Sequence, residues 1–310
     1  MIDSKSSKPV EYRSGFVAII GRPNVGKSTL LNTLLGQKVA AVSPRPQTTR
    51  QRQLGILTLE NTQIVFIDTP GIHTPHHLLG KALNNLAEEA LQEADAVVWI
   101  VDASQPPTDE DRLIASHLSG LRSLPYTLLA LNKIDLLEGE RLAKYEREFQ
   151  LLLKPALPIE ISALNGSGIQ LLQELLISHL PINEAFYPPD QVTDYYERQI
   201  ASDLIREAAL IHLRDEVPHA MAVRVDEYKE RDEQGAYISA TLFVEKDSQK
   251  GIVIGQGGAM LKKIGTHARQ SVEQMTGRKI YLDLRVKVNK NWRNNPQVLR
   301  QMGYTVIEGE

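Results

Sequence analysis

A glycine-rich loop that directly follows a short apolar run is the feature that most constrains this chain. Residues 16–20 read Phe-Val-Ala-Ile-Ile, a run typical of a buried strand, and residues 21–28 read Gly-Arg-Pro-Asn-Val-Gly-Lys-Ser. This is a G-x-x-x-x-G-K-S phosphate loop, in which glycines let backbone N–H groups point at phosphate oxygens. A helical pattern with leucines at positions 30, 31, 34 and 35 comes next, and a helix N-terminus favours an anion. The spacing therefore predicts a strand, a loop and a helix that together bind nucleotide phosphates.

Within this loop, Lys27 has the length to reach the β- and γ-phosphates, and the Ser28 hydroxyl can ligate Mg²⁺. A second phosphate contact is predicted from Asp68-Thr-Pro-Gly71, which ends a strand-like run. There Asp68 would hold Mg²⁺ through water and the Gly71 N–H would bond the γ-phosphate, so that loss of this phosphate releases the following segment. The predicted phosphate-binding residues are Gly21, Asn24, Val25, Gly26, Lys27, Ser28, Thr29, Asp68 and Gly71.

The loop Pro46-Gln-Thr-Thr-Arg50 lies between the first helical pattern and the second strand-like run. A threonine from such a loop can complete the Mg²⁺ shell and form part of a switch. We predict Thr49 for this role and keep Thr48 as the other candidate, with a plain polar loop as the alternative. The predicted Mg²⁺ ligands are Ser28, Thr49 and Asp68.

The identity of the base is indicated by Asn132-Lys-Ile-Asp135, which follows an apolar run. A carboxylate at Asp135 can accept hydrogen bonds from N1 and N2 of guanine, and adenine lacks this pair of donors. The stem of Lys133 can cover the base, and Asn132 can tie this loop to the phosphate loop. In GTPases, a backbone N–H from a loop placed like Ser162-Ala-Leu contacts guanine O6. The predicted guanine-binding residues are Asn132, Lys133, Asp135, Ser162, Ala163 and Leu164.

Strand-like and helical patterns alternate through the first half of the chain. The strand-like runs lie at residues 16–20, 53–59, 63–67, 96–101, 125–131 and 158–161, and the helical patterns at about 78–93, 108–121, 139–153 and 168–180. This alternation predicts an α/β domain with a mostly parallel sheet and helices on both faces. Ligands of such sheets bind at the carboxyl ends of the strands.

A change of pattern follows at residues 181–192, which contain three prolines and no periodicity. Beyond them, the sequence predicts a helix at 194–213, strands at 220–228 and 236–244, a helix at 257–275 and a strand at 279–288, which together make a small α+β domain. We therefore predict a flexible N-terminus at 1–14, a nucleotide-binding domain at 15–181, a linker at 182–193, and a second domain with a C-terminal tail at 194–310.

Composition excludes several classes of protein. The absence of cysteine excludes disulfides and cysteine-based zinc sites and fits a reducing cytoplasm. Residues 1–14 are too polar for a secretory signal, and no run approaches the roughly 18 apolar residues of a membrane span. Residues 246–300 carry 12 Lys/Arg against 3 Asp/Glu, whereas the rest of the chain carries 23 against 35. Such a basic block indicates either a polyanion-binding surface or a solvated basic face.

Inside this basic block, Gly255-Gln-Gly-Gly258 follows an apolar run and precedes a helical pattern. The loop and the order of elements resemble the type II KH RNA-binding fold, in which the glycines admit the nucleic-acid backbone and an adjacent apolar groove takes the bases. A helix-capping glycine turn is the alternative. Arg269 and Arg293 lie in the same basic block. The predicted RNA-binding residues are Gly255, Gln256, Gly257, Gly258, Lys262, Lys263, Lys287 and Lys290.

Over about residues 15–304, the chain resembles the Era family of GTPases. The resemblance is carried by residues 21–28, 47–50, 68–71, 132–135, 162–164 and 255–258, and by a tail at 286–304. It implies a GTPase that binds GTP, GDP and Mg²⁺, contacts 16S rRNA near its 3′ end, and acts in maturation of the small ribosomal subunit. It also implies a monomeric cytoplasmic protein with peripheral contact at the inner face of the cell membrane.

The hydrolytic group is not identified by the sequence. Ile72 follows Gly71 at the position where Ras-like proteins have a glutamine that orients the attacking water. Asn24 matches an asparagine by which some GTPases bind K⁺, an ion that can stabilise developing charge. Nearby histidines are either catalytic candidates or surface residues: His73, His76 and His77.

Two other functions stay open at this point. A P-loop ATPase or kinase is disfavoured by Asp135 and by the lack of a domain for an acceptor substrate. A non-catalytic RNA-binding assembly factor could use the nucleotide domain as a scaffold. Within the RNA loop, Gln256 stands where a lysine or arginine is often found, so flanking lysines must pair with the phosphates.

Overall fold

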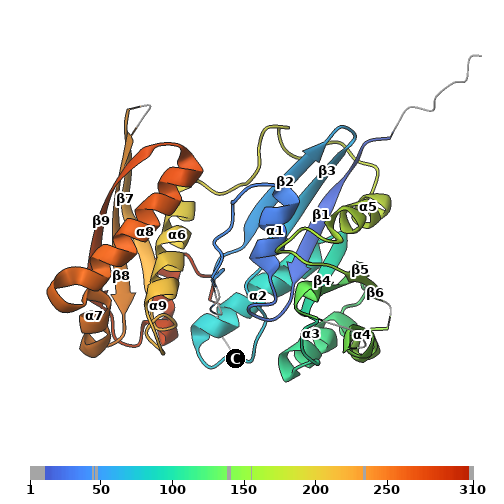
Figure 1. The fold of residues 1–310 in the computed structure, drawn as a ribbon, viewed down its shortest axis with the longest axis horizontal. Coiled ribbons are helices and arrows are strands. Elements are labelled where there is room, and N and C mark those ends of the chain that lie inside the picture. The colour runs from blue at the N-terminus through green and yellow to red at the C-terminus, as the bar shows by residue number, and fades with distance from the viewer. Residues whose placement is uncertain are drawn as a thin grey trace, which may run out of the picture.

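The computed structural model describes residues 11–43, 45, 48–137, 141–154, 156–232 and 235–306. Figure 1 shows two parts side by side, joined by an extended segment that crosses at the top of the view. The first part has a six-stranded sheet in the order β2-β3-β1-β4-β5-β6. In this sheet β2 is antiparallel to β3, and the other neighbouring strands are parallel. The strands are β1 (Arg13–Ile20), β2 (Gln53–Leu59), β3 (Thr62–Asp68), β4 (Ala96–Asp102), β5 (Tyr126–Asn132) and β6 (Leu157–Glu160).

Helices cover both faces of this sheet (Figure 1). On one face lie α1 (Lys27–Leu35) and α5 (Ile169–His179), and on the other α2 (Leu78–Glu93), α3 (Asp109–Ser119) and α4 (Arg141–Leu152). All residues of β4 are buried because a parallel strand covered on both faces is apolar throughout. The predicted α/β fold with a mostly parallel sheet is confirmed.

The second part has a three-stranded sheet of β7 (Ala222–Asp232), β8 (Gly235–Val244) and β9 (Lys279–Val288), in which β7 is antiparallel and β9 parallel to β8. One face of this sheet packs against α6 (Glu197–His212) and α8 (Ala259–Thr276). Short elements complete the chain: α7 (Asp247–Ile254), α9 (Pro296–Gln301), and the 3₁₀ turns η1 (Ile134–Leu136), η2 (Gln256–Gly258) and η3 (Trp292–Asn294). The predicted order missed α7, because Val253 is its one buried residue and no apolar stripe marks it as a helix.

The segment predicted as a linker is fastened along the edge of the first sheet. The Ile56 N–H of β2 donates to the Val192 carbonyl at 2.8 Å. The fully buried Gln63 side chain accepts from the N–H groups of Phe186 and Tyr187 at 2.8 and 2.9 Å, and donates to the Tyr187 carbonyl at 2.9 Å. The segment thereby covers β2, which would otherwise be an exposed edge strand.

The N-terminal boundary of the first sheet corrects one prediction. The sequence predicts a flexible N-terminus at 1–14, but Arg13 and Ser14 belong to β1. Ser14 is fully buried and donates to the Glu184 carbonyl, and Arg13 donates to the Leu180 carbonyl. Their polar side chains bond to groups far along the sequence, which local composition does not reveal. Residues 1–10 lie outside the described residues.

A small apolar cluster joins the two parts through α2. Trp292 lies in it fully buried, and its indole N–H donates to the Ala220 carbonyl at 2.9 Å. Because α2 follows the Asp68-to-Gly71 loop, this seam lies directly behind the predicted nucleotide switch. The cluster consists of Leu79, Ala82 and Leu83 from α2 with Ala222, Phe243, Trp292, Leu299 and Tyr304.

Candidate functional site

The phosphate loop between β1 and α1 is curled around the ammonium of Lys27. This side chain is buried, and its Nζ donates to the carbonyls of Gly21 and Arg22, both at 3.0 Å. Gly26 has φ of 108°, and a Cβ there would lie 2.4 Å from Asn132 Nδ2, so only glycine fits. Burial lowers the pKa of Lys27 to about 8 in the protein alone, with the Asp68 carboxylate opposing that shift. A bound anion at this loop would favour the charged lysine.

The three predicted Mg²⁺ ligands converge beside Lys27. The Ser28 hydroxyl lies 2.9 Å from Asp68 Oδ2 and 2.8 Å from the Thr49 hydroxyl, and Thr49 Oγ1 lies 3.2 Å from the same carboxylate oxygen. Burial raises the pKa of Asp68, against the opposing influence of Lys27 and of the two hydroxyls. One carboxylate and two hydroxyls form the hard oxygen set that Mg²⁺ prefers. Thr48 instead donates to the Arg45 carbonyl at 3.1 Å, so Thr49 is the threonine aimed at the metal position. Pro46 and Gln47 of this loop lie outside the described residues.

A small pocket opens above these groups. Gly71 borders it closely, since a Cβ there would lie 2.6 Å from the Pro23 nitrogen. Ile72 is 1% exposed and packs into the core of the first part, while its N–H donates to the Gly21 carbonyl at 3.3 Å. The pocket is lined by Pro23, Asn24, Gly26, Lys27, Ser28, Thr29, Ala41, Val42, Ser43, Thr48, Thr49 and Gly71.

The three histidines near Ile72 are not among the described residues that line this pocket. His73 Nδ1 lies 2.9 Å from the Gly71 carbonyl, and the Asn84 side chain bonds both the N–H and the carbonyl of His73. His77 sits at the start of α2, and His76 is exposed. The structure therefore places His73 as a support for the loop backbone, on the α2 side.

The predicted guanine loop is bound to both of its neighbours through Asn132. Its Nδ2 donates to the Val25 carbonyl at 2.7 Å, and its Oδ1 accepts from the Ala163 N–H at 2.8 Å. The Ser162 hydroxyl donates to Asp135 Oδ1 at 2.5 Å. Leu164 is 81% exposed beside this loop. The phosphate loop and both predicted guanine loops therefore meet at one edge of the sheet, at the carboxyl ends of β1, β5 and β6.

Arg50, the residue after Thr49, reaches into the second part. Its guanidinium is buried, donates to the carbonyls of Met221 and His219 at 2.9 and 3.0 Å, and lies 5.6 Å from the centre of the Trp292 ring. Burial lowers the pKa of Arg50, and Tyr304 opposes this shift. In the sequence, Arg50 is only part of a loop motif and no role for it is predicted, because its partners lie about 170 residues away.

The G-x-x-G loop of the second part forms η2 between α7 and α8. Gly255, Gly257 and Gly258 have φ of 73°, 59° and 81°, and no heavy atom lies within 4 Å of a Cβ built at either of the last two. A groove runs from this loop between α8 and β9. It is lined by Gly258, Leu261, Lys262, Gly265, Thr266, Arg269, Leu282 and Leu284. Apolar and basic side chains thus stand beside an unobstructed backbone, as a polynucleotide requires.

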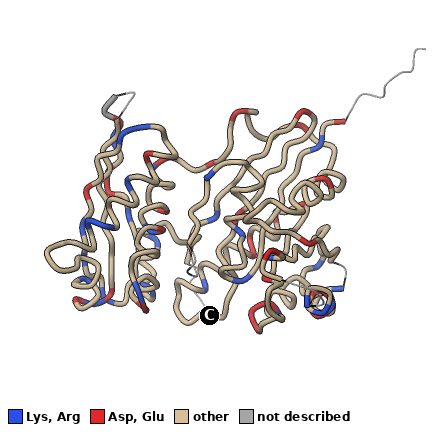
Figure 2. The backbone as a smooth tube through the Cα atoms, viewed as in Figure 1, with Lys and Arg blue, Asp and Glu red and all other residues tan. Residues whose placement is uncertain are grey.

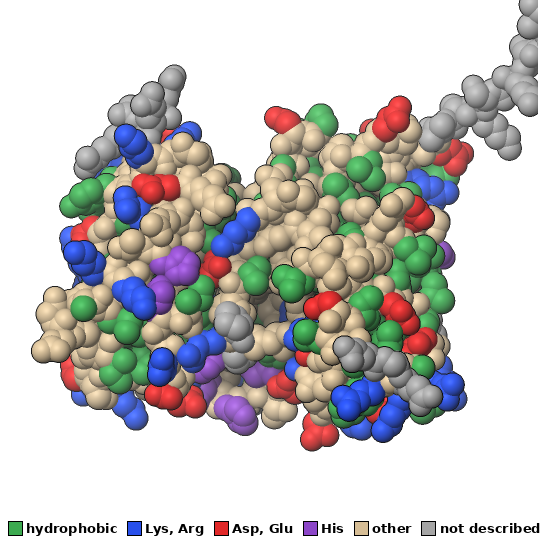
Figure 3. Space-filling view, in the orientation of Figure 1, with side chains coloured by type: hydrophobic (Ala, Val, Ile, Leu, Met, Phe, Trp, Pro, Cys, Tyr) green, Lys and Arg blue, Asp and Glu red, His purple; other side chains and the backbone are tan. Residues whose placement is uncertain are grey.

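The predicted basic residues do not all face this groove. Figures 2 and 3 show Lys and Arg spread over helices and strands of the second part, interspersed with acidic residues. Lys262 lines the groove, whereas Lys263, Lys287 and Lys290 are not among its lining residues. Lys287 alternates along β9 with Val286 and Val288, which pack against the helices, so it lies on the opposite face of the sheet. Arg269, which the sequence placed in the basic block, lines the groove.

Comparison with known proteins identifies both parts. A family described as "50S ribosome-binding GTPase" matches residues 16–133, and one described as "KH domain" matches residues 216–293. GTPase Era of Heliobacterium modesticaldum is 42% identical over 294 residues, which cover 95% of this chain and 98% of that protein. The chain belongs to the Era family of GTPases.

Two solved Era structures share the architecture. Era in complex with MgGDPNP and nucleotides 1506–1542 of 16S ribosomal RNA has a TM-score of 0.89 and 37% identity, over 95% of this chain and 99% of that one. A variant of Aquifex aeolicus Era bound to GDP·AlF4⁻ also gives 0.89 and 37%, over 94% and 99%. Among the described residues of this Era-family chain, no helix has the length and apolar character to cross a membrane.

Proposed function

We propose that this Era-family GTPase is a switch that binds 16S rRNA near its 3′ end and acts in assembly of the small ribosomal subunit. The observation that carries this proposal is the seam between α2 and the KH part. The segment that follows the Asp68-to-Gly71 loop packs directly on Trp292, Leu299 and Tyr304. A change at the γ-phosphate therefore has a short path to the RNA-binding part.

A second contact supports the same coupling. Thr49 points its hydroxyl at Ser28 and Asp68, and the next residue, Arg50, is bonded to two carbonyls of the KH part. Release of Thr49 after hydrolysis would displace the adjacent Arg50, whose buried guanidinium is bonded to the KH part. Because breaking the contacts of a buried charge is costly, the displacement would be passed on to that part. GTP would in this way set the placement of the KH part, and RNA would be gripped or released accordingly.

The residues of the nucleotide site act by positioning and by charge. Gly21, Asn24, Val25, Gly26, Lys27, Ser28, Thr29, Asp68 and Gly71 would surround the phosphates, and Asn132, Lys133, Asp135, Ser162, Ala163 and Leu164 the guanine. Ser28, Thr49 and Asp68 would hold Mg²⁺, which would neutralise charge on the phosphates. Lys27 lies beside these ligands and would pair with the β- and γ-phosphates.

Hydrolysis requires a group other than residue 72. The Ile72 side chain is turned into the core and has no polar atom. We propose that Asn24 helps to hold K⁺ beside the phosphates, where a monovalent cation can stabilise developing negative charge. This ion and the RNA would raise an otherwise slow turnover.

On the RNA side, we propose that Gly255, Gln256, Gly257 and Gly258 face the backbone and that the groove between α8 and β9 takes the bases. Lys262 and Arg269 line this groove and would pair with phosphates. Lys263, Lys287 and Lys290 would contribute only to the general field. The rest of the proposal is supported by sequence and family resemblance. It comprises a linker at residues 182–193, a monomeric state, a cytoplasmic location and peripheral contact with the inner membrane face.

The decisive experiment measures initial GTPase rates in KCl and in NaCl at equal ionic strength, each with and without an oligonucleotide of the 16S 3′ end. A scrambled oligonucleotide of the same composition is the control. We expect slow turnover alone and an increase on the order of 10- to 100-fold when K⁺ and the specific RNA are both present.

Each comparison in this experiment tests a different part of the proposal. Equal rates in K⁺ and Na⁺ would remove the role of Asn24 and leave the GTPase intact. An equal response to the scrambled RNA would remove the RNA specificity. Undetectable turnover under all conditions would favour the scaffold alternative. A parallel assay with ATP in place of GTP tests the remaining alternative, and equal rates with the two nucleotides would favour an ATPase.

A further inference from the structure

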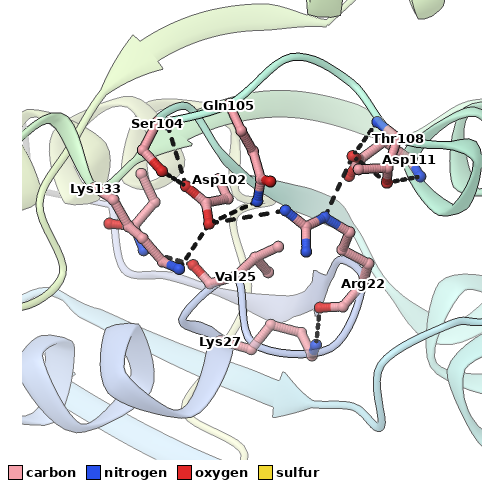
Figure 4. Close-up of polar contacts among 10 residues, drawn as sticks. Arg22, Val25, Lys27, Asp102, Ser104, Gln105, Thr108, Asp111 and Lys133 are labelled. Carbon is pink, nitrogen blue, oxygen red and sulfur yellow. Dashed lines mark hydrogen bonds and ion pairs between the residues drawn. The ribbon is translucent and has the colours of Figure 1, made fainter. Parts of the chain in front are cut away.

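One buried carboxylate lies between the phosphate loop and the guanine loop without belonging to either. Asp102 ends β4 and is 5% exposed. Its Oδ2 accepts from Lys133 Nζ at 2.7 Å and from Gln105 Nε2 at 3.1 Å, while its Oδ1 accepts from the N–H and hydroxyl of Ser104 at 3.1 and 2.6 Å. Figure 4 shows these donors arranged around the carboxylate.

The ionic state of Asp102 follows from these contacts. Burial by itself raises the pKa of this carboxyl, but the hydrogen bonds from Lys133 and Ser104 outweigh burial and leave the pKa below its usual value. Asp102 is thus a carboxylate at neutral pH, and Lys133 is the nearer of its ionic partners.

Lys133 needs an anchor of this kind, because its backbone is strained. Its φ is 69°, in the left-handed region that is unfavourable for a residue with a Cβ. Such a conformation persists only where surrounding groups fix it. The Lys133 carbonyl accepts from the Leu136 N–H at 3.0 Å, and Asp102 fixes the far end of the side chain.

The same carboxylate is tied to the phosphate loop. Arg22 Nη2 lies 3.7 Å from Asp102 Oδ2, and Arg22 Nε lies 3.3 Å from Asp111 Oδ2 in the first turn of α3. Asp111 in turn accepts from the N–H and hydroxyl of Thr108 in a capping box. The Arg22 carbonyl accepts from Lys27. Figure 4 shows this chain of contacts, which runs from α3 through Arg22 to Asp102 and Lys133.

We propose that Asp102 is a positioning residue for guanine binding, which fixes the Lys133 ammonium against the phosphate loop so that the lysine stem lies over the base. This inference rests on the proposed guanine site. Asp102 would act on the base through Lys133, and the hydrogen bonds from Ser104 and Gln105 hold the carboxylate in place.

The test compares the affinity of GDP for the full chain and for three variants. Asp102→Asn removes the charge and keeps the shape, Lys133→Met removes the ammonium and keeps the stem, and the third variant carries both changes. We expect each single change to weaken GDP binding about tenfold, as for loss of a charge-assisted hydrogen bond. The double variant should bind no more weakly than either single one, because both changes break the same contact.

Two further measurements separate positioning from a general structural role. Binding of tripolyphosphate with Mg²⁺, which has no base, should be unchanged in Asp102→Asn. Asp226→Asn is the matched control, because Asp226 is a carboxylate that also pairs with an arginine and a hydroxyl, those of Arg224 and Thr241, but lies in the second part of the chain and contacts neither Lys133 nor Arg22. Its GDP affinity should equal that of the unchanged chain.

The outcomes that overturn the proposal are distinct. Unchanged or tighter GDP binding in Asp102→Asn would show that the carboxylate does not help Lys133. Additive losses in the double variant, or an equal loss of tripolyphosphate binding, would assign Asp102 a structural role. If Lys133→Ala, which removes the stem as well, leaves GDP affinity intact, the guanine site itself is misassigned and this role falls with it.

Discussion

The nucleotide site and the RNA groove are built in opposite ways. In the nucleotide site, Lys27, Asn132 and Asp68 are buried and already hydrogen-bonded to neighbouring loops. In the RNA groove, Gly257 and Gly258 have open space around them, and Lys262 is exposed. The first site is preorganised for one small ligand, whereas the second offers a surface on which a long polyanion is held by many weak contacts. Single substitutions should therefore have large effects in the first and small, salt-dependent effects in the second.

The largest effect should come from Lys27→Ala. This change removes the buried ammonium around which the phosphate loop is curled, and we expect GTP and GDP affinity to fall on the order of 100- to 1,000-fold. Fluorescent-nucleotide titration measures this loss, and circular dichroism checks that the fold is retained. Nucleotide affinity equal to that of the unchanged chain would contradict the phosphate-loop assignment and the contrast drawn from it.

Asp135→Asn should change the choice of base. The change replaces a carboxylate, which offers two acceptors, with an amide, which offers one acceptor and one donor. The amide N–H₂ group would then face the N2 donor of guanine, whereas xanthine has an acceptor oxygen at that position. We expect GTP affinity to fall about 100-fold and xanthosine triphosphate to become the better ligand. Competition between the two nucleotides measures this shift, and retained preference for GTP would place the base elsewhere.

Arg50→Met tests whether the two sites communicate. We expect the ratio of RNA affinities in the GTP-analogue and GDP states to shrink about five- to tenfold, because the buried link from Thr49 to the KH part is lost. Lys38→Met is the matched control. Lys38 also joins the two parts, through an ion pair with Glu207 at 3.0 Å, but it is not adjacent in the chain to Thr49 or to another predicted Mg²⁺ ligand. If both variants change the ratio equally, Arg50 has no special role.

The smallest effects should come from the basic residues. Lys262 and Arg269 line the groove. Lys262→Ala and Arg269→Ala should each weaken RNA binding a few-fold and reduce the slope of log affinity against log salt concentration by about 1. Lys287→Ala, on the opposite face of the sheet, should leave the slope unchanged. Filter binding over a salt series measures all three variants. An equal change in slope for Lys287→Ala would move the RNA to the outer face of the sheet.

Much of the fold was predictable because its elements carry strong local patterns. The predicted bounds of β2, α2 and β9 agree with the structure, since each element has a clear period or a continuous apolar run between turns. Residues 21–28, 68–71, 132–135 and 162–164 lie at or directly after the carboxyl ends of strands, as the sequence predicts, whereas the loop at 46–50 lies between α1 and β2. The α/β fold, the KH part and membership of the Era family are confirmed.

The remaining features depend on long-range contacts that no local pattern encodes. The choice of Thr49 over Thr48 depends on which hydroxyl faces Ser28 and Asp68. Lys287 shares the basic block with Lys262 but lies on another face, which depends on how β9 packs. In the sequence, Asp102 is only the last residue of a predicted buried strand. Its contact with Lys133 could not be predicted, because Lys133 lies 31 residues further along the chain.

The fastened segment at residues 182–193 limits how far the KH part can travel. A free tether of this length could extend to roughly 40 Å and would allow almost any placement. Here the last point of attachment is the Leu54 N–H, which donates to Asp194 Oδ1 at 2.9 Å, and α6 begins at Glu197. Only the few residues between Asp194 and Glu197 therefore stay unfastened between the first sheet and α6. Any rotation of the KH part relative to the first part would have to be taken up there, beside β2 and a short distance along the chain from Arg50.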